Sequence, residues 1–126
     1  MDEIKVGLTG EQTTTVTEET TARHLGSGGV GVFSTPSMIA LMEYSAVTAI
    51  DPHLPEGQAS VGTEVCIKHL KATPLGQQVR AQAEVIEIDR RRVLFKVQAW
   101  DEKQLIGEGT HTRFVIDVAR FAGGVG

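Results

Sequence analysis

The 126-residue sequence has little of several features that would indicate a specialised class of protein. Its single cysteine, Cys66, cannot form an internal disulfide, which favours a reducing compartment. No apolar run approaches the ~18 residues that a membrane-spanning helix requires. The formal net charge of −4 provides no overall attraction to nucleic acid. These absences argue against a disulfide-stabilised secreted protein, a membrane protein and a nucleic-acid-binding protein.

Basic residues cluster only at Arg90–Arg92, where we expect a solvent-exposed turn, with phosphate binding as the alternative. The first residues, Met1–Lys5, are acidic where a secretion signal would be basic and then apolar. With 40% apolar and 22% charged residues, the composition is typical of a soluble globular protein. We therefore expect one cytoplasmic domain over residues 1–126, with a disordered glycine-rich tail at 122–126.

Two kinds of cofactor site find no support in the sequence. The glycine-rich segment Arg23–Gly31 lacks the lysine of a P-loop and the GxGxxG spacing, so we expect a mobile loop or lid. The four histidines and the acidic residues lack the spacing that is typical of metal ligands. The sequence therefore predicts neither a bound metal nor another cofactor.

The segment Pro36–Ile50 is almost wholly apolar and predicts a single long helix. Thr35 is a favourable N-cap, and proline suits the first helical turn because its missing N–H costs nothing there. The helix is expected to end before Asp51–Gly57, a segment that contains prolines and a glycine.

The rest of the chain alternates between apolar and polar residues, as β-strands do. One strand is expected near Thr13–Thr17, and four follow the helix: Val61–His69, Gln78–Glu84, Val93–Trp100 and Ile106–Val118. One long helix with about four antiparallel strands predicts an α+β fold in which a curved sheet wraps around the helix, the hotdog arrangement. Such a fold leaves edge strands and part of the helix uncovered, so we expect a homodimer.

One carboxylate, Glu43, interrupts the apolar helix. On a helical wheel it shares its face with apolar residues, and no lysine or arginine stands three or four positions away. A buried charge requires a partner, a neutral state or a wet cavity, and each of these is also a feature of active-site acids. The residues alone support a catalytic and a structural carboxylate equally.

His69 alternates with Val65 and Ile67 and therefore lies on the apolar side of its strand. A lone histidine in this position is often a structural core residue. Because Glu43 needs a partner and an imidazole supplies an N–H, we predict that His69 pairs with Glu43. Cys66 falls on the opposite side of the strand, which argues against a Cys–His nucleophilic pair.

Thr35 lies eight residues before Glu43, a rise of ~12 Å along a regular helix. The two side chains would not touch unless a bend before Pro36 or a second subunit brought them together. A capping role explains Thr35 fully. The free N–H groups and positive dipole end of the helix are also suited to a thioester or carboxylate oxygen.

Two further positions are candidates for substrate contacts. Gly62 has no Cβ, so a ligand can approach its backbone closely. Arg113 shares its strand face with Gly107, Gly109 and His111, and this face either lines a cavity or is exposed to solvent.

These motifs resemble the fluoroacetyl-CoA thioesterase family. The resemblance rests on Val32–Thr35 followed by Met38–Ile50, on Val61–Pro74 and on Gly107–Arg113, and it covers nearly the whole chain. It implies a hotdog fold, usually dimeric, and hydrolysis of acyl-CoA thioesters. It also implies catalytic roles for Thr35, Glu43 and His69, an acyl-site role for the backbone of Gly62 and an active-site role for Arg113.

One segment departs from the family's pattern. The fluoroacetate-specific member has a longer segment before the helix, with phenylalanines that gate the acyl pocket. Here that segment is the short run Gly26–Gly31, and Phe33 is the only aromatic residue nearby. We therefore predict hydrolysis of a short or unusual acyl-CoA, with Phe33, Gly62 and Arg113 contacting the substrate.

The residues leave open whether Glu43 attacks the thioester or activates a water molecule. Two other functions stay open as well. One is a non-catalytic hotdog module that binds acyl-CoA or an acyl carrier. The other is a hotdog hydratase or dehydratase, although the helix region lacks an Asp-x-x-x-x-His pattern.

Overall fold

The computed structural model describes the backbone of residues 1–125 and the side chains of residues 1–121. Over this range the structure has the five strands and the long helix in the order predicted from the sequence, together with two short helices that were not predicted, one of which overlaps the start of the expected loop. The elements are β1 (Thr9–Thr15), α1 (Ala22–Leu25), α2 (Thr35–Ile50), β2 (Gln58–His69), β3 (Gln78–Asp89), β4 (Arg92–Trp100), β5 (Leu105–Asp117) and α3 (Val118–Val125), with short 3-10 turns η1 (Glu18–Thr20) and η2 (Asp51–His53).

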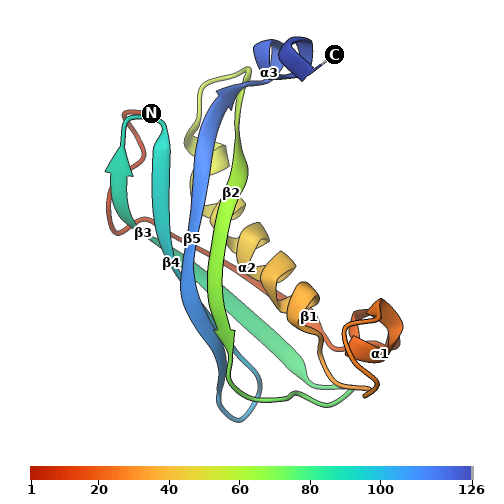
Figure 1. The fold of residues 1–126 in the computed structure, drawn as a ribbon. Coiled ribbons are helices and arrows are strands. Elements are labelled where there is room, and N and C mark those ends of the chain that lie inside the picture. The colour runs from red at the N-terminus through yellow and green to blue at the C-terminus, as the bar shows by residue number, and fades with distance from the viewer. Residues whose placement is uncertain (126) are drawn as a thin grey trace.

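The strands of the described chain form one antiparallel sheet in the order β1-β3-β4-β5-β2. The sheet curls, and α2 lies along its concave side (Figure 1). This arrangement confirms the predicted hotdog fold. β1 and β2 are the two edge strands, and the middle of β2, residues 62–66, is exposed to solvent.

The start of α2 differs in one respect from the prediction. Ser34, not Thr35, is the N-cap, and its side chain accepts a hydrogen bond from the backbone N–H of Ser37 at 3.1 Å. Both neighbouring hydroxyl groups can cap a helix, but only one can occupy the cap position. Thr35 is therefore the first helical residue, and its hydroxyl group is available for another partner.

α2 packs on the sheet through a buried face centred on Met38, Met42 and Ala49. Apart from the fully buried Phe95, the facing side chains of β3 and β4 are small or β-branched, which lets the helix lie close to the sheet. They are Val79, Ala81, Ala83, Val85, Val93, Val97 and Ala99, and all are fully buried. The apolar alternation of the strands thus builds the core in the predicted way.

A β-bulge in β2 changes which residues face the helix. The register with β5 shifts between Gly62 and Glu64, so that the alternation reverses at this point. His69 keeps its predicted inward position, opposite Gly107. Simple alternation along the strand would place Gly62 on the opposite side from His69, but the bulge brings Gly62 to the inward face.

The remaining expectations concern exposed or terminal segments. Arg91 and Arg92 form half-exposed ion pairs with Asp117 and Glu87, as expected for a solvated turn. The tail that was expected to be disordered, residues 122–126, overlaps α3, and its last residue lies outside the described residues. Among residues 1–125, the longest helices are too short or too polar to cross a membrane.

Candidate active site

Thr35 and His69 meet at the N-terminal end of α2. The Thr35 hydroxyl oxygen lies 2.8 Å from Nδ1 of His69, the last residue of β2. The other ring nitrogen, Nε2, is buried and has no hydrogen-bond partner among the described residues. A buried ring nitrogen without a partner has unused capacity to donate or accept a proton.

This pair lines a pocket of about 350 Å³, a size within the range of small-molecule sites. Phe33 and Ser34 form one wall beside Thr35, and residues 69–72 form another. Ser27, Gly28 and Val30 border it from the glycine-rich loop, so the loop presents no aromatic side chain to the pocket. Phe33 itself is 1% exposed and belongs to the core as much as to the pocket.

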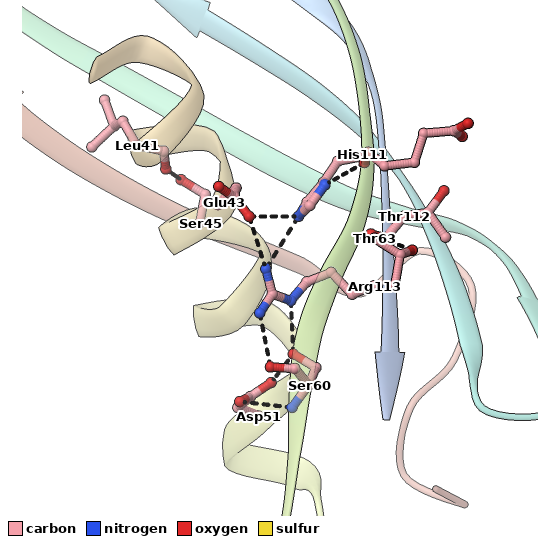
Figure 2. A network of polar contacts seen from close by, with 10 residues as sticks. Leu41, Glu43, Ser45, Asp51, Ser60, Thr63, His111, Thr112 and Arg113 are labelled. Carbon is pink, nitrogen blue, oxygen red and sulfur yellow. Dashed lines mark hydrogen bonds and ion pairs between the residues drawn. The ribbon is translucent and has the colours of Figure 1, made fainter. Parts of the chain in front are cut away.

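Glu43 lies further along α2 and contacts a different group of residues. Its Oε2 is 3.5 Å from Nη1 of Arg113 and 3.7 Å from Nε2 of His111 (Figure 2). A Cβ atom added to Gly62 would fall 2.6 Å from the same Oε2. The missing side chain of Gly62 therefore leaves the space that the carboxylate occupies. The Glu43 side chain is 40% exposed in a single copy of the chain.

Arg113 is buried, which decides whether its strand face lines a cavity or is exposed to solvent. Its side chain is 7% exposed, and His111 is 1% exposed. The face that carries both therefore points toward α2 and not toward solvent. His111 Nδ1 lies 2.8 Å from the backbone oxygen of Glu64, so this nitrogen carries the proton. Nε2 of the neutral ring then accepts from Arg113 Nη1 at 3.2 Å.

The guanidinium group of Arg113 is fixed from its other side by Ser60. Its Nε donates to the Ser60 hydroxyl at 2.7 Å, and its Nη2 donates to the Ser60 carbonyl at 2.8 Å. The Ser60 hydroxyl lies 2.5 Å from the carboxylate of Asp51. Figure 2 shows the resulting line of contacts from Asp51 through Arg113 to Glu43.

The predicted pairing of Glu43 with His69 is therefore absent within one copy of the chain. His69 bonds Thr35, whereas Glu43 bonds Arg113. The helix is continuous from Thr35 to Ile50. Its rise over eight residues keeps Glu43 ~12 Å along the axis from Thr35, the partner of His69. The candidate residues thus form a Thr35–His69 pair at the end of the helix and a Glu43–Arg113–Gly62 group at its middle.

Comparison with known proteins places this geometry in a family. A family model described as fluoroacetyl-CoA-specific thioesterase matches residues 16–119. The chain belongs to this fluoroacetyl-CoA-specific thioesterase family. A fluoroacetyl-CoA thioesterase of Streptantibioticus cattleyicolor is 42% identical over 90 residues, which are 71% of this chain. The chain spans about 65% of the length of that curated relative.

Solved structures of thioesterases superpose closely on this chain. The fluoroacetyl-CoA thioesterase FlK matches with a TM-score of 0.91 and 36% identity, over 98% of this chain and 96% of FlK. FlK variants have been solved with acetyl-CoA and with fluoroacetate and CoA. A Thermus thermophilus protein described as a thioesterase superfamily member matches with a TM-score of 0.91 and 31% identity, covering 99% of this chain and 93% of its own.

Three residues of the site were not predicted from the sequence to take part in it. His111 was noted only as a neighbour of Arg113 on one strand face. Asp51 and Ser60 were not considered, because one follows the helix and the other precedes the bulge in β2. A serine two residues before a strand glycine carries no signal of its own. Only the register of β2 against β5 brings it beside Arg113.

The stability of the folded protein is expected to fall as the pH falls below about 6.5. Burial lowers the pKa of His111, the Arg113 charge lowers it further, and burial also lowers the pKa of His69. The unfolded chain therefore binds protons at a pH where the folded chain does not, so acid favours unfolding. Urea unfolding between about pH 7.5 and pH 5 measures this slope.

His111→Gln should reduce this slope without removing it, because His69 keeps its own contribution. His24→Gln is the matched control, since it replaces an exposed histidine by the same residue. A slope in His111→Gln equal to that of the wild type would show that His111 is not held neutral in the fold.

Proposed function

We propose that the protein is an acyl-CoA thioesterase that hydrolyses a short or unusual acyl-CoA to the carboxylate and CoA. The main support is the Glu43 carboxylate, which lies in the space left by Gly62 and contacts Arg113 at 3.5 Å, while Arg113 forms its shorter hydrogen bonds with Ser60. A carboxylate that is only loosely paired keeps an oxygen free for chemistry. Family membership and the CoA complexes of FlK support the same reaction class.

In this proposal Glu43 acts in one of two ways. It attacks the thioester carbonyl and forms an anhydride, which water then hydrolyses, or it removes a proton from an attacking water. In both cases the C–S bond breaks and the CoA thiolate takes up a proton. Transfer of ¹⁸O from labelled water into the Glu43 carboxylate during turnover would identify attack by Glu43.

Thr35, His69 and Gly62 have supporting roles in the proposed reaction. The Nε2 atom of His69 has no partner and is suited to moving a proton to or from the leaving group. Thr35 and the first N–H groups of α2 are suited to the oxygen on which negative charge develops, as is the backbone N–H of Gly62. No step requires a metal ion or another cofactor.

We further propose that the active protein is a homodimer whose site combines residues of two copies. One copy keeps Glu43 about 12 Å from Thr35 along the helix, so the three catalytic candidates do not converge within it. The exposed middle of β2 and the half-exposed Glu43 face are surfaces that a second copy would cover. The cytoplasmic location stays a prediction from the sequence.

The reaction class is tested by measuring CoA release from a panel of acyl-CoAs of increasing size. The proposal expects release with at least one short acyl group, including groups larger than fluoroacetyl, because no aromatic side chain borders the pocket from residues 27–30. Binding of acyl-CoA without release would indicate a binding module. Hydration of enoyl-CoA without release would indicate a hydratase.

A mixed dimer tests the shared site. Glu43→Gln and His69→Asn are each expected to lower CoA release by about 10²-fold or more as homodimers. Co-expressed with two different affinity tags and purified through both, the mixed dimer has one intact site if each site uses both copies. We expect roughly half of the wild-type activity from it. No gain over the two parent homodimers would show that each site lies within one copy.

A further inference from the structure

Arg113 is the buried charge on which the Glu43 group depends, and its bonds are unevenly distributed. Two of its three nitrogen atoms donate to Ser60, at 2.7 and 2.8 Å. The third nitrogen faces His111 at 3.2 Å and Glu43 at 3.5 Å. The short bonds therefore lie on the side away from Glu43, and the contact with Glu43 is the longest of the set.

The direction of these bonds is fixed by chemistry. A guanidinium group can only donate hydrogen bonds, so the Ser60 hydroxyl accepts from Arg113 and its own proton must go elsewhere. The carboxylate of Asp51 receives that proton at 2.5 Å and also lies 3.3 Å from the backbone N–H of Ser60. The contacts therefore run from the buried cation Arg113 through the Ser60 hydroxyl to the Asp51 carboxylate. Arg113 donates to Ser60, and Ser60 donates to Asp51.

Among the side chains that the structure describes in one copy, Arg113 is the only fixed cation in contact with Glu43. From β5, Arg113 and His111 face it, and the His111 ring is neutral when its Nε2 accepts from Arg113. From β2 it meets Gly62, which has no side chain. On α2 the neighbouring Tyr44 is 57% exposed and carries no positive charge. The position of the Arg113 guanidinium therefore sets the electrostatic surroundings of Glu43.

We propose that Ser60 and Asp51 are positioning residues that hold Arg113 back from Glu43. Free to rotate, a guanidinium group beside a carboxylate forms a short bidentate pair, which occupies both carboxylate oxygens. Held by Ser60, Arg113 presents one nitrogen to one oxygen, and the other oxygen of Glu43 stays available for reaction. This inference rests on the proposed thioesterase function and adds a cause for the reactivity of Glu43.

The kinetic test compares Ser60→Ala, Ser60→Thr and Asp51→Asn with the wild type. Ser60→Ala removes the hydroxyl group, so we expect kcat to fall by about 10- to 100-fold. KM should change by less than about twofold, because Ser60 lies outside the lining of the pocket. Ser60→Thr keeps the hydroxyl group and should restore most of the activity. Asp51→Asn should give an intermediate loss in kcat.

Asp117→Asn is the matched control. Asp117 is also a partly buried carboxylate that pairs with an arginine, Arg91, but it lies outside this line of contacts. We expect its kcat to equal that of the wild type. An equal loss in this control, or a loss in Ser60→Ala that Ser60→Thr does not restore, would overturn the positioning role.

A second measurement does not depend on activity. The Nε–H group of Arg113 donates to a buried hydroxyl, so its NMR signal should exchange slowly with water and disappear in Arg113→Lys. We expect the signal to lose its protection in Ser60→Ala and to keep it in Asp117→Asn. An unchanged signal in Ser60→Ala would overturn the inference, whereas a wild type without CoA release would overturn the proposed function alone.

Discussion

Glu43→Gln is expected to lower CoA release by about 10²- to 10⁴-fold, the largest effect of any single substitution on activity. Glutamine has nearly the same shape as glutamate, and its oxygen can still accept from Arg113, so the contact at 3.5 Å can persist. It can neither attack the thioester nor accept a proton from water. The loss should therefore appear in kcat while KM stays near the wild-type value.

The control for this substitution is Glu108→Gln on β5. Glu108 is exposed on the outer side of the sheet, and its replacement by glutamine removes the same single negative charge. Initial rates of thiol release, measured over a range of acyl-CoA concentrations, give kcat and KM for both variants. A folded Glu43→Gln variant with wild-type kcat would exclude Glu43 from the reaction, and with it the central step of the proposed function.

The sequence was sufficient for the architecture because the periodicity of apolar residues is strong. The wholly apolar segment Pro36–Ile50 corresponds to α2, and the alternating segments correspond to β2–β5. Strand parity also grouped Arg113 with His111 correctly. These features depend on local pattern, which a sequence displays directly.

The predictions that failed depend on single-residue choices or on distance. Two adjacent hydroxyl residues were candidates for the helix cap, and the choice of Ser34 released Thr35 to bond His69. The bulge that turns Gly62 toward Glu43 was not predicted, because a glycine inside a strand is equally consistent with a bulge and with the close approach of a ligand to the backbone. The pairing of Glu43 with His69 conflicts with the length of a straight helix.

Arg113 shows both what the sequence could predict and what it could not. Its place on an inward strand face was predictable as one of two options, but its partners were not. Ser60 and Asp51 lie 53 and 62 positions before it in the sequence, and tertiary structure alone brings them together. The site is thus built by the register of β2 against β5, which sequence periodicity does not determine.

Gly10→Ala is expected to have the largest effect on stability. Gly10 lies on β1, at the point where α2 passes closest to the sheet. An added Cβ would fall 2.2 Å from the carbonyl oxygen of Ser45 and 2.5 Å from the amide nitrogen of Ala49. Both are backbone atoms of α2, so no side chain can rotate away to make room. Either β1 or the helix must move, which we expect to cost about 3 kcal/mol or more.

The matched control is Gly29→Ala, the same chemical change in the glycine-rich loop. A Cβ at position 29 meets nothing within 4 Å, so we expect a change in the free energy of unfolding of less than about 0.5 kcal/mol. Urea unfolding followed by circular dichroism measures both variants. Because a domain of this size has a total stability of roughly 5–15 kcal/mol, a loss of 3 kcal/mol shifts the midpoint clearly. An unfolding midpoint of Gly10→Ala equal to that of the wild type would contradict the close approach of β1 to α2. The sheet would then not wrap around the helix on the side of β1.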